Sequence, residues 1–141
     1  MTRGVLIFAQ NNSEIDYAKI SLFAAKRVKK YLNVPVSLVT DSKDGLLASQ
    51  PDAVEVFDNI ITIWTDTDQT KQFYDGTLSS KTLVWKNLSR SDCYNLTPYD
   101  ETLVIDSDYI ISSDNLSNIW NNKHDFLIYS NSFDLAQWRD D

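Results

Sequence analysis

The sequence is poor in the residues that build disulfides and zinc sites. Its 141 residues include one cysteine, Cys93, and one histidine, His124. A single cysteine excludes an internal disulfide framework and a multi-cysteine zinc site. A single histidine excludes a histidine pair for zinc and argues against a histidine-based catalytic triad. The scarcity of cysteine fits a reducing compartment, so we expect a cytoplasmic protein.

Positive charge and long apolar runs are also scarce. Thirteen Lys and Arg residues face 20 Asp and Glu residues, which gives a net charge of −7. This balance argues against binding along a nucleic-acid backbone or docking on an anionic membrane. The apolar run at residues 5–9 is too short for a signal peptide, and no run approaches transmembrane length. We expect no nucleic-acid partner and no membrane span.

Apolar periodicity predicts one α/β domain over residues 1–141. Short apolar runs predict strands at residues 4–9, 36–40, 60–64, 102–106 and 126–129. Helical spacing predicts helices at residues 13–32, 78–91 and 115–120. The first of these helices is expected to start with a capping box of Ser13 and Asp16. The second is expected to turn Val84, Trp85 and Leu88 inward.

The first 41 residues therefore form a βαβ unit, which implies parallel strands and a right-handed crossover. The expected fold class is α/β, a mostly parallel, Rossmann-like sheet with helices on both faces.

Residues 102–108, Thr-Leu-Val-Ile-Asp-Ser-Asp, are the most informative stretch. A buried strand here would deliver Asp106 and Asp108 to the carboxyl edge of the sheet, where ligands bind in open α/β folds. Side chains alternate along a strand, so both carboxylates should lie on one side. Burying them beside apolar residues is costly without a partner, and Mg²⁺ or Mn²⁺ is a suitable one. The alternative is a simple turn. A second Asp-x-Asp triplet, at residues 66–68, is interpreted as a solvated loop.

Arg90 has two interpretations. It lies near the end of a predicted helix and shortly before the acidic strand, so its side chain could reach the same edge. It could equally be a cation that stabilises a helix C-terminus. Cys93 is expected to be a small buried residue, His124 a surface residue, and the tryptophans part of the core.

These residues carry a resemblance to a known family. The order is a first strand, a polar loop with Tyr17-Ala18-Lys19, a βαβ unit, a segment with Arg90, and an apolar strand that runs into Asp-x-Asp. It resembles the nucleotide-binding half of nucleotide-sugar glycosyltransferases with the A-type fold, of the glycogenin and galactosyltransferase kind. Residues 99–108, Tyr-Asp-Glu-Thr-Leu-Val-Ile-Asp-Ser-Asp, are similar to the turn and strand before that family's motif. The chain is also similar to phage-type relatives of the family.

The resemblance implies a hexosyltransferase-type domain that binds a nucleotide-sugar donor, a UDP-sugar first of all, through Mn²⁺ or Mg²⁺. Asp108 would bind the metal, Asp106 the metal or the ribose and sugar of the donor, and Arg90 the donor sugar. The resemblance assigns the nucleotide base to residues near the first loop: Ala9, Gln10 and Asn11, with Tyr17 as a stacking partner. It leaves the catalytic residues and the acceptor unassigned.

Members of that family continue into an acceptor half that carries a histidine metal ligand. This chain stops at Asp141, so the acceptor half is absent, truncated, or supplied by a second copy or a partner chain. We expect a donor-binding domain whose transfer to an acceptor requires the missing half. One rival is a non-catalytic or split-enzyme interaction module with an apolar patch involving Trp120, Phe133, Leu135 and Trp138. The other is a phosphatase of the haloacid dehalogenase type, in which the first Asp is a nucleophile.

Overall fold

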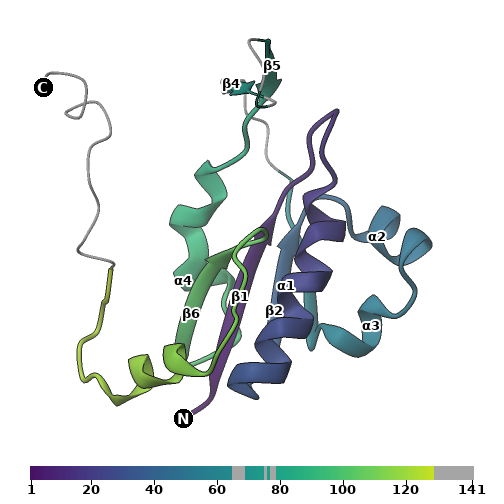
Figure 1. Ribbon diagram of the computed structural model, residues 1–141. Helices are drawn as coiled ribbons and strands as arrows, with labels where there is room; N and C mark the ends of the chain where they lie inside the picture. The colour runs from purple at the N-terminus through teal and green to yellow at the C-terminus, as the bar shows by residue number, and fades with distance from the viewer. Residues whose placement is uncertain (65–68, 75, 77–78, 129–141) are drawn as a thin grey trace, which may run out of the picture.

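A four-stranded parallel sheet organises the part of the chain that the computed structural model describes, which is residues 1–64, 69–74, 76 and 79–128 (Figure 1). The strand order is β3-β2-β1-β6. The sheet strands are β1 (Arg3–Ala9), β2 (Val36–Thr40), β3 (Asn59–Thr62) and β6 (Glu101–Asp106). A separate antiparallel hairpin consists of β4 (Thr70–Tyr74) and β5 (Ser80–Val84). The helices are α1 (Tyr17–Leu32), α2 (Lys43–Ser49), α3 (Ala53–Val56) and α4 (Cys93–Leu96), with 3₁₀ helices η1 (Leu88–Asp92) and η2 (Asn115–Asn121).

The predicted βαβ unit is confirmed. β1 and β2 pair in parallel, and α1 connects them. The helix begins later than the sequence predicts, because Asp16 rather than Ser13 is its N-cap and accepts the Lys19 N–H at 3.0 Å. Asn12 accepts the N–H groups of Glu14 and Ile15, so this segment forms a local turn before the helix. At the other end, Asn33 adopts a left-handed conformation that stops the helix.

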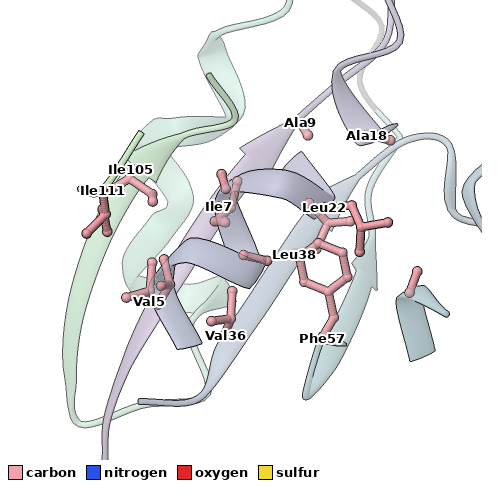
Figure 2. Packing of buried hydrophobic residues seen from close by; sticks show 14 of the residues in the cluster. Val5, Ile7, Ala9, Ala18, Leu22, Val36, Leu38, Phe57, Ile105 and Ile111 are labelled. Carbon is pink, nitrogen blue, oxygen red and sulfur yellow. The ribbon is translucent and has the colours of Figure 1, made fainter. Parts of the chain in front are cut away.

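Helices cover both faces of the sheet, as predicted. On one face, Val5, Ile7 and Leu38 pack with the apolar side of α1 and with Leu46 of α2 (Figure 2). On the other face, Leu6, Phe8 and Val39 form a smaller cluster. Cys93 and Leu96 of α4 pack against this cluster as partly buried residues. None of the helices in the described residues is long and apolar enough to cross a bilayer.

The helix predicted at residues 78–91 is wrong. Residues 80–84 form β5 instead, and Val84, Trp85 and Leu88 are 40%, 37% and 64% exposed. Their spacing imitates a helix, but Thr82 and Val84 are β-branched and favour a strand, and the serines of this segment disfavour a helix interior. Pairing with β4 decides the outcome.

Other predictions hold more closely. The strands expected at 60–64 and 102–106 are present as β3 and β6, and the short helix expected at 115–120 is the 3₁₀ helix η2. The strand expected at 126–129 is absent from residues 126–128, and Tyr129 lies outside the described residues. β6 is not buried throughout, since Val104 is 38% exposed. The reason is that β6 lies at the border of the described sheet.

Tyr99 packs directly on the backbone of β1. Its hydroxyl shares a hydrogen bond of 2.6 Å with Ser37 of β2. A Cβ atom added to Gly4 would overlap the Tyr99 ring, so this strand position needs glycine for close approach.

Gly4→Ala is therefore expected to lower the free energy of unfolding by about 2 kcal/mol, the usual penalty for overpacking a tight contact. Urea unfolding followed by circular dichroism measures the change. Gly45→Ala is the matched control, because its Cβ would meet only the Ser42 hydroxyl at 3.0 Å and alanine favours the helix. Equal losses in the two variants would contradict the role given to Tyr99.

Candidate functional site

The strand order places a topological switch point between β1 and β6. From β1 the chain moves to β2 and then β3 on one side, and it later returns to place β6 on the other side. Where the strand order of an open parallel sheet reverses, ligands bind at the carboxyl ends of the two neighbouring strands. Ala9 ends β1 and Asp106 ends β6, so the residues that follow them flank this switch point.

A cleft of about 320 Å³ lies at this place, within the size range of small-molecule sites. The sheet side and α1 contribute Phe8, Gln10, Asn12, Tyr17, Asp106, Ser107 and Asp108. The hairpin and the segment that follows it contribute Lys71, Phe73, Val84, Trp85, Lys86, Asn87 and Arg90. The cleft thus combines two carboxylates, three cations and several aromatic rings.

Asp106 and Asp108 both line the cleft, with Ser107 between them. The Tyr109 N–H donates to the Asp106 carbonyl at 3.1 Å, which makes a tight turn just after β6. Ser107 is only 4% exposed, whereas the Asp106 side chain is 58% exposed. The expectation that the two carboxylates are buried is therefore wrong. Because they are exposed, these carboxylates need no cation to offset a cost of burial. The argument for a metal ion there is instead that both carboxylates line the same cleft.

Arg90 reaches the same edge. It lies in η1, not at the end of a long helix, and its guanidinium forms an ion pair with Asp106. The Arg90 side chain is 31% exposed, so solvent screens the pair. Arg90 also donates to the side chain of Asn87. Arg90 also lies in the last turn of η1, so both positions expected from the sequence occur together.

Tyr17 and Gln10 also reach the cleft. Partial burial and then the charge of Asp108 raise the pKa of Tyr17, while the charge of Arg90 lowers it. The Tyr17 hydroxyl therefore stays protonated at neutral pH and can donate a hydrogen bond. Gln10 is 8% exposed, and its side-chain oxygen accepts from Ser89.

Two expected base-binding residues do not line the cleft. Ala9 is 1% exposed and belongs to the core. The Asn11 side chain accepts the Ala18 N–H at 3.0 Å and donates to Asp16 at 2.9 Å, so it organises the start of α1. Asn12 lines the cleft in place of Asn11. Its buried Nδ2 has no hydrogen-bond partner among the described residues, a signal that the sequence could not provide.

Asp41 and Lys86 join the two sides of the cleft. Asp41 follows β2 and accepts the Asn11 N–H at 2.9 Å. Its other oxygen accepts from the Lys86 ammonium at 2.5 Å, and the two side chains are only 12% and 24% exposed. This partly buried link holds the loop after β1 against the segment after β5. Sequence reasoning missed it, because 45 positions separate the pair.

A divalent ion fits the acidic pair only with added ligands. No cluster of three or more His, Cys, Asp or Glu residues with metal-binding geometry occurs in residues 1–64, 69–74, 76 and 79–128. Two carboxylates completed by water and phosphate oxygens suit Mg²⁺ or Mn²⁺, which often keep several waters and bind through one or two carboxylates. The donor set is therefore compatible with a metal held jointly by protein and ligand.

Residues considered for other roles lie elsewhere. His124 is exposed and outside the cleft, and Cys93 is partly buried. Trp64 and Trp85 are 85% and 37% exposed, so they are not core residues as expected. Of the patch proposed for an interaction module, Trp120 is partly buried and its ring lies beneath Arg3. Phe133, Leu135 and Trp138 lie outside the described residues.

No protein-family model, curated protein or solved structure matches this chain.

Proposed function

We propose that this chain is a donor-binding domain of the glycosyltransferase type, which binds a nucleotide-sugar with a divalent ion at Asp106 and Asp108. One observation carries the proposal: both carboxylates line a single cleft with Tyr17 and Arg90, at the switch point of a parallel sheet. This is where open α/β sheets bind nucleotides. A UDP-sugar is the first donor to test, and transfer to an acceptor is part of the same proposal.

The mixed charge of the cleft supports a diphosphate ligand. Two carboxylates alone would repel phosphate, but Arg90, Lys86 and Lys71 line the same space. When bound, Mn²⁺ or Mg²⁺ would neutralise the charge that grows on a departing diphosphate. Asp106 and Asp108 would hold the ion, and they would bind it together with the ligand's phosphate oxygens.

The remaining residues would orient the donor. Tyr17 can stack on a flat ring and keeps a hydroxyl donor. Asn12 brings an unpartnered Nδ2 that suits a carbonyl or phosphate oxygen. Arg90 would move from Asp106 to a phosphate or sugar oxygen, because the metal and the guanidinium compete for the same carboxylate.

The phosphatase alternative has less support. In that class of phosphatase the nucleophilic aspartate follows the first strand, whereas Asp106 ends β6. The first strand of the sheet ends in Ala9 and Gln10 and so carries no carboxylate at its tip.

Isothermal titration calorimetry tests the proposal with UDP- and GDP-sugars, each with and without Mn²⁺. We expect at least one donor to bind with a sub-millimolar Kd, about tenfold tighter with Mn²⁺ than without it. Hydrolysis of p-nitrophenyl phosphate is the control reaction and should be absent. No heat of binding at millimolar donor, or clear phosphatase activity, would overturn the proposal.

A further inference from the structure

The β4–β5 hairpin has two unlike faces. Its register pairs Lys71 with Leu83 and Phe73 with Lys81, and directly opposed residues share a face of an antiparallel pair. Trp85 follows Leu83 by two positions and continues the same side. The opposite face carries exposed residues that are mostly polar: Thr70, Gln72, Tyr74, Ser80, Thr82 and Val84.

Residues of the first face supply most of the hairpin's contribution to the cleft, and Val84 of the opposite face adds to it. Lys71, Phe73 and Trp85 all line the cleft. Phe73 and Leu83 are the partly buried members of the two strands, whereas Tyr74 on the other face is 69% exposed. In Figure 1 the hairpin stands beyond the end of the main sheet, away from the N-terminus. The hairpin is thus a wall of the cleft, formed by chain distant from the acidic pair.

Two ion pairs hold this wall in place. Lys81 of β5 contacts Glu14 in the loop before α1 at 3.1 Å. Lys86, just after β5, forms the more buried pair with Asp41 described above. The Glu14 pair is exposed, with side-chain exposures of 69% and 47%, so it adds little stability by itself. Together the contacts set the position of the hairpin against the loop that carries Asn12.

The cleft side of the hairpin offers a flat ring beside a positive charge. The Lys71 ammonium lies 5.3 Å from the centroid of the Trp85 ring. Stacking on an exposed aromatic face suits any nucleobase, because every base has a π-face. A nearby ammonium suits a phosphate group. The ligand class that presents a flat ring and phosphates together is a nucleoside phosphate.

We propose that the hairpin is the base-binding wall of the site, with Trp85 stacking on the nucleobase and Lys71 neutralising the phosphates. The inference rests on the proposed function, which requires that the cleft binds a nucleotide. It adds to that function a second binding element, the hairpin, outside the Asp-x-Asp motif. It also predicts weak selectivity among bases, since stacking is tolerant of base identity.

Calorimetry with UDP, ADP and inorganic pyrophosphate, each with Mg²⁺, separates the two parts of this wall. Trp85→Ala is expected to weaken UDP and ADP binding about tenfold and to leave pyrophosphate binding unchanged. Lys71→Met is expected to weaken all three ligands about threefold to tenfold. Trp85→Phe should restore most of the nucleotide affinity, which guards against a loss of the hairpin fold. Tyr74→Ala, an aromatic change on the opposite face, is the matched control and should change nothing.

The outcomes distinguish this inference from the proposed function. If Asp106→Asn removes the metal dependence while Trp85→Ala has no effect, the hairpin wall is wrong and the donor site stands. If Trp85→Ala weakens nucleotides that bind equally well without metal, the wall stands and the metal site is wrong. Equal losses in Tyr74→Ala and Trp85→Ala would also overturn the inference. A wild-type chain that binds none of the nucleotides overturns both.

Discussion

Asp108→Asn is expected to weaken Mn²⁺-dependent binding of a UDP-sugar about 100-fold, or about 2.7 kcal/mol. Asparagine keeps the shape of the side chain but removes the negative charge, and hard divalent ions depend on the number of charged oxygen ligands. The loss is large because the site has few protein carboxylates to begin with. Asp106→Asn should produce a similar loss, since both carboxylates line the same cleft.

The effect should be confined to the metal-dependent part of the affinity. Binding measured without a divalent ion should change less than threefold in either variant. Asp52→Asn is the matched control: it also removes one surface carboxylate, but Asp52 pairs with Lys26 and does not line the cleft. Calorimetry of all three variants with and without Mn²⁺ gives the comparison. Unchanged metal dependence in Asp108→Asn would refute the assigned ligand.

Arg90→Gln is expected to change two affinities in opposite directions. Mn²⁺ alone should bind about fivefold more tightly, because Asp106 loses the guanidinium that competes for its oxygens. The gain is modest, since the pair is partly exposed and worth about 1 kcal/mol. The nucleotide-sugar should bind about tenfold more weakly, because a charge-assisted hydrogen bond to the ligand is lost. The ratio of the two affinities thus shifts about 50-fold.

Opposite signs are difficult to obtain from general damage to the fold. A variant that merely loosened η1 would weaken both ligands together. Arg3→Gln is the control, because Arg3 forms a comparable ion pair with Glu101 at 2.5 Å, at the other end of β1. That change should leave both affinities as they are. Manganese titrations by electron paramagnetic resonance report free Mn²⁺ directly and need no turnover. Weakening of both ligands by Arg90→Gln would exclude the exchange of Arg90 between Asp106 and the donor.

The sequence predicted the central βαβ unit and β6 because their patterns have few alternatives. Residues 4–9 are a continuous apolar run, residues 36–40 are rich in β-branched and apolar residues, and the helix between them repeats apolar residues every three or four positions. The hairpin could not be predicted the same way. Val84, Trp85 and Leu88 have helical spacing, and only pairing with β4, for example of Lys71 with Leu83, makes residues 80–84 a strand.

The candidate site was predictable in part for a related reason. A residue that ends a strand of a parallel sheet must lie at its carboxyl edge, so Asp106 and Gln10 could be placed from local pattern alone. The choice between Asn11 and Asn12 depends on which amide caps the start of α1, and neighbouring asparagines look alike in sequence. The exposure of Asp106 could not be predicted either. The apolar residues of β6 do not reveal that this strand lies at the border of the described sheet.

Local sequence patterns were enough to predict the strand–helix–strand core and the position of two aspartates at the end of a strand. The reason is that apolar periodicity, and the order of residues along a strand, are properties of a few neighbouring residues. Only the tertiary structure decided that Arg90, Asp41, Lys86 and the hairpin meet those acids around one cleft. Such meetings depend on strand order and on packing between segments tens of residues apart, and no short window of sequence contains that information.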